Sequence, residues 1–334
     1  MKRIVECVPN FSEGRDMKVI DAIAKSIADV QGAKLLSVEP DKDYNRCVVT
    51  FVGEPEPVKE AAFQATKTAS ELIDMSRHKG EHPRIGATDV VPFVPVSGVT
   101  MEECVHLAHS YGKRVGEELG IPVFLYEEAA QVPDRRNLSN IRKGEYEGLE
   151  EKLKNPAWKP DYGPGQFNTK SGAMVAGARV FLVAYNVNLN TNQKELAHEI
   201  ALRIRESGRS VKNEKGESLK VPGALKSVKA MGVLLEQFNI AQVSINLTNF
   251  NITPPHVAFE QVKKEACTLG IDATGSEIVG LIPKGALLMA GRFYFGKDTQ
   301  HVSEEQLIQR AIAELGLSQL APFEPNKKVI EYMI

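Results

Sequence analysis

The stretch that decides the fold is "KLLSVEPDKDYNRCVVTFVG" (residues 34–53). Its two ends, 34–40 and 46–53, have the pattern of β-strands, and the second is rich in β-branched residues and ends at a glycine. A strand-like and then a helix-like segment precede it, "RIVECVP" (3–9) and "MKVIDAIAKSIADV" (17–30), and a helix (58–75) and a strand (89–96) follow. The order strand, helix, two strands, helix, strand predicts a split-βαβ, ferredoxin-like sheet.

The second half of the chain repeats this order without repeating the sequence. The expected elements are a strand at 178–189, a helix at 193–207, two strands within 227–250, a helix at 256–270 and a strand at 276–283. Before them, the predicted helix 100–120 opens with a capping box of Thr100 and Glu103, and a strand at 121–128 follows. We predict an α/β (α+β) protein with two subdomains, residues 1–177 and 178–334. Each is expected to hold a split-βαβ sheet covered by helices, with a substrate cleft or tunnel between them.

The segment from about 129 to 177 differs from the rest in its content of proline, glycine and charge. A loop of this length inside a compact domain is usually functional or disordered. Trp158, Tyr162 and Phe167 argue against disorder, because aromatic side chains favour burial or stacking on a ligand. We therefore expect a functional loop here.

Composition and charge exclude several classes of protein. The formal net charge of the 334 residues is −2, which gives no global attraction to nucleic acid or to an anionic membrane. No signal-peptide pattern opens the chain, and no run of about 18 apolar residues is present to span a membrane. The four cysteines are widely scattered and form no C-x-x-C pair, so we expect no disulfide framework and a cytoplasmic location.

The sequence "MSRHKGEHPRIG" (75–86) concentrates charge around two histidines four residues apart, His78 and His82. This spacing occurs on zinc-binding helices, but Gly80 and Pro83 oppose a helix, and Lys79 stands where the zinc motif has glutamate. A solvated polar loop is a second interpretation. The third is catalysis, because neighbouring charges can tune an imidazole to act first as general base and then as general acid near neutral pH.

The glycine-rich sequence "GPGQFNTKSG" (163–172) is a second candidate site. It matches neither the P-loop pattern nor the dinucleotide-binding fingerprint. Its flexible backbone is suited to bring amide groups close to a planar or anionic ligand.

Several longer stretches resemble the formiminotransferase family, and the similarity extends over essentially the whole chain. They are "VECVPNFSEG" (5–14), "LIDMSRHKGEHPRIGATDVVPFVPV" (72–96), "NIRKGEYEGL" (140–149), "NLTNF" (246–250) and "APFEPNKKVIEYMI" (321–334). The resemblance implies transfer of the formimino group from N-formimino-L-glutamate to N5 of tetrahydrofolate, as its polyglutamate, in histidine degradation and one-carbon metabolism. The products would be 5-formimidoyltetrahydrofolate and L-glutamate. It also implies a homodimer of two α/β subdomains around a tunnel, no metal, and no cyclodeaminase activity, because the chain ends after the transferase part.

The resemblance assigns roles to His82 and to residues 163–172, and the chemistry of the implied reaction suggests roles for several other residues. The second histidine of the 75–86 block is the family's acid/base and corresponds to His82. Glu39 and Glu81 are expected to stabilise the cationic formimino carbon, Glu39 as a catalytic residue and Glu81 within the substrate site. Arginine forks match carboxylates, so Arg46 and Arg84 are expected to bind those of the glutamate moiety, and Asn10 to orient the substrate. The family's folate-binding stretch corresponds to Gly163, Pro164, Gly165, Gln166, Phe167, Asn168, Thr169, Lys170, Ser171 and Gly172.

Two departures from the family pattern keep other functions open. Better-known members carry aspartate where this chain has Glu39 and have a different loop at the position of 40–44. Their folate-binding stretch also differs in sequence from residues 163–172 of this chain. The alternatives are a formyl-transferring relative that uses another folate form, a folate-binding protein without catalysis, and a metal-dependent amidine hydrolase that uses His78 and His82.

Overall fold

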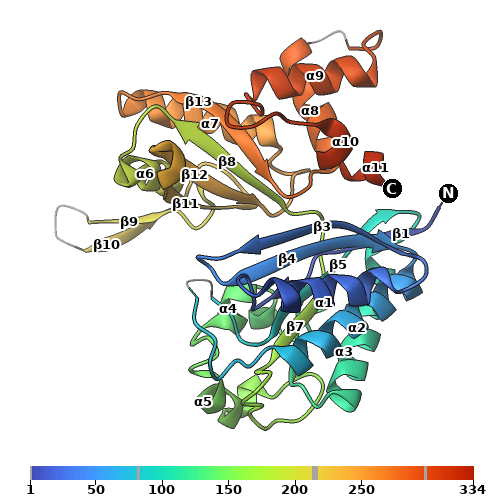
Figure 1. Cartoon of the computed structure of the whole chain (residues 1–334). Coiled ribbons are helices and arrows are strands. Elements are labelled where there is room, and N and C mark those ends of the chain that lie inside the picture. The colour runs from blue at the N-terminus through green and yellow to red at the C-terminus, as the bar shows by residue number, and fades with distance from the viewer. Residues whose placement is uncertain (1, 81–82, 213–216, 297–298) are drawn as a thin grey trace. The chain divides into compact units, whose positions relative to one another are not determined.

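The computed structural model describes residues 2–80, 83–212, 217–296 and 299–334. The chain divides into two compact units, Met1–Val180 and Phe181–Ile334 (Figure 1). Both are mixed α/β units whose sheets are covered by helices, as the sequence predicts.

The first unit is built on a seven-stranded sheet. Its strands are β1 (Ile4–Cys7), β2 (Asn10–Phe11), β3 (Ala33–Asp41), β4 (Arg46–Gly53), β5 (Thr88–Ser97), β6 (Val123–Glu127) and β7 (Met174–Ala178). β1 and β2 both pair with β4 on one side and β5 on the other, and β3 pairs with β4, all antiparallel. α1 connects the β1–β2 strand to β3, and β4 lies between these two in the sheet. This is the split-βαβ order. β7 and then β6 extend the sheet beyond β5 in parallel.

Three helices cover one face of this sheet: α1 (Met17–Ala28), α2 (Pro55–Leu72) and α3 (Met101–Glu118). The predicted capping box of α3 is present, since Glu103 N donates to Thr100 Oγ1 and Thr100 N to Glu103 Oε2. α2 begins three residues before the predicted start because Pro55 and Pro57 lie in its first turn, where a missing N–H costs no helical hydrogen bond. Alternate strand residues pack under the helices, among them Val5, Cys7, Val49, Phe51, Val91, Phe93, Leu125 and Ala176.

The opposite face at β5, β6 and β7 is covered by the segment that was predicted to be one long loop. This segment contains α4 (Leu138–Arg142), α5 (Leu149–Lys154), two short 3₁₀ turns (Pro133–Arg135 and Pro156–Trp158) and the strand β7. Ile141 and Leu149 are buried against the intervening strand residues, which include Val90, Phe124 and Val175. The prediction of an irregular segment is therefore wrong in part. β7 has the sequence "MVAGA", is buried on both faces and so lacks the alternation that marks a half-exposed strand.

The second unit contains a four-stranded antiparallel sheet in the order β11-β12-β8-β13. Its strands are β8 (Val183–Leu189), β11 (Val228–Leu235), β12 (Ile240–Leu247) and β13 (Ala273–Val279), and its connecting helices are α6 (Lys194–Ile204) and α7 (Pro255–Thr268). β12 lies between β8 and β11, again the split-βαβ order. α6 and α7 cover an apolar face, whereas Asn186, Asn188, Gln242 and Glu277 on other strand positions hydrogen-bond to one another.

Further elements of the second unit lie outside the predicted repeat. A hairpin of β9 (Arg209–Lys212) and β10 (Ser218–Val221) follows α6. After β13 come α8 (Lys284–Phe295), α9 (Glu304–Glu314), α10 (Pro325–Lys328) and α11 (Ile330–Met333), and a 3₁₀ turn (Glu236–Phe238) joins β11 to β12. α8 and α9 complete the apolar core of this unit. All four cysteines are free thiols. Within the described part of the chain, no helix has the length and apolar character needed to span a bilayer.

Candidate active site

A row of polar side chains crosses the face of the first sheet that α1, α2 and α3 leave uncovered. Asn10 on β2 is paired with Val48 on β4, and Val48 is paired with Glu39 on β3, so the three side chains share one face. Neighbouring strands lie about 4.8 Å apart, which separates Asn10 from Glu39 by about 10 Å across Val48. The Glu39 carboxylate accepts a hydrogen bond of 2.8 Å from the Ser37 hydroxyl. Asn10, predicted to bind substrate, and Glu39, predicted to be catalytic, therefore lie within the reach of one small molecule.

Arg46 lies on the same face, two residues before Val48 on β4. Its guanidinium carbon lies 5.4 Å from the centre of the Tyr44 ring. Arg46 Nε is buried and has no hydrogen-bond partner among the described residues. Burial lowers the pKa of this guanidinium, with Asp41 acting in the opposite direction. An arginine stays charged even so, and a cation with an unfilled donor is suited to bind an anionic group.

The turn between β3 and β4 is tied to the 75–80 segment through Asn45. This residue has a left-handed backbone (φ 48°), which asparagine adopts more readily than most residues. Its side chain accepts a hydrogen bond from Gly14 N (3.0 Å) and donates one to Lys79 O (2.9 Å). A Cβ at Gly80 would lie 2.3 Å from the carbonyl oxygen of Tyr44, so a glycine is required at this contact. The histidine-containing segment is thereby fixed beside the polar row.

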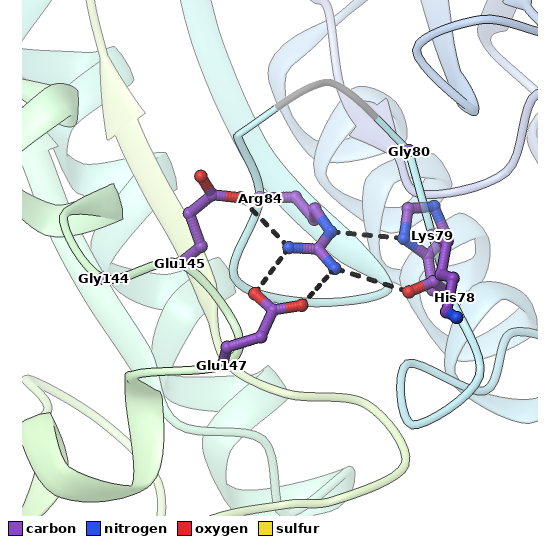
Figure 2. Close-up of a pocket in the computed structure, with 7 residues that line it drawn as sticks. All are labelled: His78, Lys79, Gly80, Arg84, Gly144, Glu145 and Glu147. Atoms are coloured by element: carbon purple, nitrogen blue, oxygen red, sulfur yellow. Dashed lines mark hydrogen bonds and ion pairs between the residues drawn. The ribbon is translucent and has the colours of Figure 1, made fainter.

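Arg84 forms the centre of a polar group with Glu145, Glu147 and the imidazole of His78, which we call the Arg84 cluster (Figure 2). Its side chain is 6% exposed. Glu147 accepts two hydrogen bonds from the guanidinium (2.7 and 2.8 Å) and Glu145 accepts one of 3.0 Å. Arg84 Nε donates to His78 Nδ1 at 3.2 Å, and Arg84 Nη2 lies 3.4 Å from His78 O. Charge-assisted bonds thus use all the donor groups of Arg84 within the protein.

These contacts fix the protonation of His78. Arginine only donates, so His78 Nδ1 is the acceptor and the ring proton is on Nε2, which lies 3.0 Å from Asn45 O. Burial lowers the pKa of His78, with Arg84 acting in the same direction, and the ring is therefore neutral at pH 7. Both ring nitrogens are engaged with protein atoms. Across the residues that the structure describes, no three His, Cys, Asp or Glu side chains gather as a metal site would require.

A largely buried ion pair between Asp89 and Arg142 adjoins the Arg84 cluster. The Asp89 side chain, 2% exposed, accepts hydrogen bonds from Ile85 N (2.9 Å), Arg142 Nε (3.0 Å) and Arg142 Nη2. Ile85 follows Arg84 directly, so this pair fixes the chain where it leaves the cluster. Arg142 ends α4, and Asp89 lies near the start of β5.

Two adjoining pockets open on these groups. One, of about 400 Å³, is lined by the Arg84 cluster together with Lys79, Gly80 and Gly144. The other is a crevice too narrow to admit a water molecule, and it is lined by Asn10, Phe11, Ser12, Tyr44, Asn45, Arg46, His78, Arg84 and Asp89. Three predicted site residues, Asn10, Arg46 and Arg84, thus line one narrow crevice. Glu81 and His82, which the sequence also singles out, lie outside the described residues.

The predicted folate segment, 163–172, packs beside this region and lines neither pocket. Gly172 has φ 68°, and a Cβ there would lie 2.2 Å from Ile85 O, so the segment crosses closely over the chain next to Arg84. Ala87 N donates to Ser171 O at 2.9 Å, and Gly86 forms a β-bridge with Gly172. These contacts place its C-terminal end against residues 85–87.

Sequence reasoning missed the partners of Arg84 and Asp89. Glu145 and Glu147 stand in "KGEYEG" (143–148), and Arg142 precedes this turn directly. The available signal was a pair of glutamates between two glycines in a basic surrounding. Their pairing with Arg84 spans more than 60 residues, and no local pattern indicates it.

Comparison with known proteins gives a consistent result over the whole chain. The family described as "Formiminotransferase domain, N-terminal subdomain" matches residues 4–179, and "Formiminotransferase domain" matches residues 184–334. Two proteins named glutamate formimidoyltransferase are each 46% identical to the chain. The one from Streptococcus pyogenes aligns over 88% of this chain and 94% of its own length, and the one from Thermoplasma acidophilum over 93% and 99%. The formimidoyltransferase-cyclodeaminase of Dictyostelium discoideum is 52% identical over all of this chain, which spans 61% of that longer protein.

Proposed function

Because the chain belongs to the formiminotransferase family, we propose that it transfers the formimino group of N-formimino-L-glutamate to N5 of tetrahydrofolate. The products are L-glutamate and 5-formimidoyltetrahydrofolate. The names of the two 46%-identical relatives, which this chain matches over nearly their full length, support this reaction. Tetrahydrofolate, in its polyglutamate form, is the co-substrate and no metal takes part. A cytoplasmic homodimer is part of the proposal, and the four free thiols agree with a reducing compartment.

The chemistry of the substrate explains the residue types in the site. A formimino group is an amidine and carries a positive charge at neutral pH, so its carbon is already electrophilic. N5 of tetrahydrofolate attacks this carbon and a tetrahedral intermediate forms. N5 then loses a proton, the glutamate nitrogen gains one, and the bond between that nitrogen and the carbon breaks. A single imidazole can accept the first proton and deliver the second.

We assign the proton transfers to His82 on the sequence resemblance. His78 is not available for this role without breaking its contacts, since both of its ring nitrogens are hydrogen-bonded. Glu39 stabilises the cationic carbon, and Glu81, which directly precedes His82 in the sequence, is proposed to assist within the substrate site. Binding both substrates in one site also converts a bimolecular step into an effectively unimolecular one, which supplies a large part of the rate.

Arg46 is our candidate for binding a carboxylate of the glutamate moiety. The observation that best supports the site is that Asn10, Arg46 and Arg84 line one narrow crevice, with Glu39 on the same sheet face as Asn10 and Arg46. Arg46 has an unfilled donor, whereas the donors of Arg84 are occupied by its cluster. Residues 163–172 receive the folate.

An assay of substrate omission tests the proposed function. Purified protein is incubated with N-formimino-L-glutamate, with and without tetrahydrofolate and with and without a chelator, and both products are measured. We expect both products only when tetrahydrofolate is present, and no effect of the chelator. Glutamate release without folate would indicate a hydrolase, and folate binding without either product would indicate a binding protein. His82→Ala should lose turnover by at least about 100-fold, the usual share of acid–base catalysis, and still bind both substrates.

A further inference from the structure

The turn that joins α4 to α5, residues 143–148, contacts two parts of the site at once. It is compact: Gly144 and Glu145 have positive φ angles (91° and 54°), and Gly148 N donates to Gly144 O at 2.7 Å. Three consecutive side chains, Glu145, Tyr146 and Glu147, leave this short turn. No role for any of them follows from the reaction described above.

The glutamates of the turn hold the Arg84 side of the site. Glu147 forms a two-bonded fork with the guanidinium of Arg84, and Glu145 adds a third bond. The main chain contributes as well, since Tyr146 N donates to Arg84 O at 2.9 Å. Through Arg84 Nε, the same contacts orient the ring of His78. His78 and Arg84 stand on either side of residue 82 in the sequence, so the turn fixes the chain before and after the proposed acid/base.

Tyr146 reaches the folate segment. Its hydroxyl donates to Thr169 O at 2.5 Å, and its ring lies 5.3 Å from that of Phe167, inclined at 48°. Both partners belong to residues 163–172. Because Tyr146 packs on Phe167 and hydrogen-bonds to Thr169, it makes an apolar and a polar contact together and restrains the backbone between these two residues.

We propose that Tyr146 and Glu147 are positioning residues for the transfer reaction. Their shared turn fixes the position of the folate segment relative to the Arg84 cluster. We expect this to align N5 of tetrahydrofolate with the proton-transfer group. Neither side chain exchanges protons or bonds with a substrate. This inference rests on the proposed function and assigns separate consequences to the two residues. Tyr146 governs the binding of tetrahydrofolate, and Glu147 governs the rate of the bound complex.

Two conservative substitutions, each of which changes a single functional group, test the inference. Tyr146→Phe removes only the hydroxyl and keeps the ring on Phe167. Its KM and its calorimetric Kd for tetrahydrofolate should rise by about three- to ten-fold, the size of one hydrogen bond, with kcat within two-fold of the native value. Glu147→Gln keeps the shape of the side chain and removes its charge. Its kcat should fall by about ten-fold, with KM for tetrahydrofolate within two-fold.

Glu150→Gln serves as the matched control, because Glu150 lies on α5 with 62% of its side chain exposed and its one ion pair among the described residues, with Lys154, is 3.9 Å long. This variant should keep native kcat and KM. Transferase activity of the native protein in the same assay tests the proposed function separately. Given that activity, an unchanged KM and Kd for Tyr146→Phe would overturn the inference. So would an equal fall of kcat and rise of KM in both variants together with a lowered melting temperature, since this pattern indicates a general loss of structure.

Discussion

Replacing Asp89 by asparagine removes one charge from the ion pair that supports the Arg84 cluster. The Asp89 side chain is 2% exposed and that of Arg142 is 17% exposed. Asparagine can still accept the hydrogen bond from Ile85 N, so the main loss is the partner of a mostly buried guanidinium. Breaking a buried pair in this way costs about 3–5 kcal/mol, and the partial exposure of Arg142 places the expected cost near the lower end, about 3 kcal/mol.

This loss should appear as a lower melting temperature of the first unit, residues 1–180. For a domain of this size each kcal/mol corresponds to about 2–4 °C, so differential scanning calorimetry should show a decrease of about 6–12 °C. The double variant Asp89→Asn/Arg142→Met should recover more than half of the decrease, because it removes the unpaired charge. Asp29→Asn, in the exposed pair of Lys25 and Asp29, should stay within about 2 °C of the native protein. A melting temperature of Asp89→Asn within 2 °C of native would refute the reasoning.

Three further predictions concern the site. Arg46→Met should raise KM for formiminoglutamate by about 10-fold or more, the size of a charge-assisted hydrogen bond, and an unchanged KM in steady-state assays would exclude the contact. Burial lowers the pKa of His78, so as the pH falls the unfolded chain binds a proton at this histidine before the folded protein does. The free energy of unfolding measured with urea should therefore decrease below about pH 6.5, and should decrease less steeply in His78→Gln. Gly172→Ala should lower the melting temperature and weaken tetrahydrofolate binding, because φ is 68° and the new Cβ would meet Ile85 O. A Cβ added at Gly165 in the same segment would meet no described atom within 4 Å, so Gly165→Ala should keep the native melting temperature and serves as the control for that measurement.

The repeated split-βαβ order could be predicted because its elements carry clear periodic signals. Strands such as β4 and helices such as α1 each have one buried face, which produces alternation or helical spacing in the sequence. β7 and α8 gave no such signal. β7 is five small or apolar residues buried on both faces, and α8, "KGALLMAGRFYF", is apolar on most sides, with Phe293 and Phe295 among its exposed residues.

That Asn10, Glu39 and Arg46 lie near one another could be expected, because each is at or next to the end of a predicted strand. Their shared face became apparent only from the pairing of β2, β3 and β4, and their roles remain predictions. The Arg84 cluster depends on contacts across more than 60 residues and on the conformation of a six-residue turn. Local sequence patterns do not encode such contacts. The assignment of His82 remains a prediction from the family resemblance.

The most direct test of the central claim follows the reacting carbon itself. N-formimino-L-glutamate labelled with ¹³C in the formimino group is mixed with tetrahydrofolate and the protein, and the label is traced by NMR. We predict that the labelled carbon becomes bonded to N5 of tetrahydrofolate and that one L-glutamate is released for each carbon transferred. Label found only in formamide or N-formylglutamate, with tetrahydrofolate unchanged, would contradict the account.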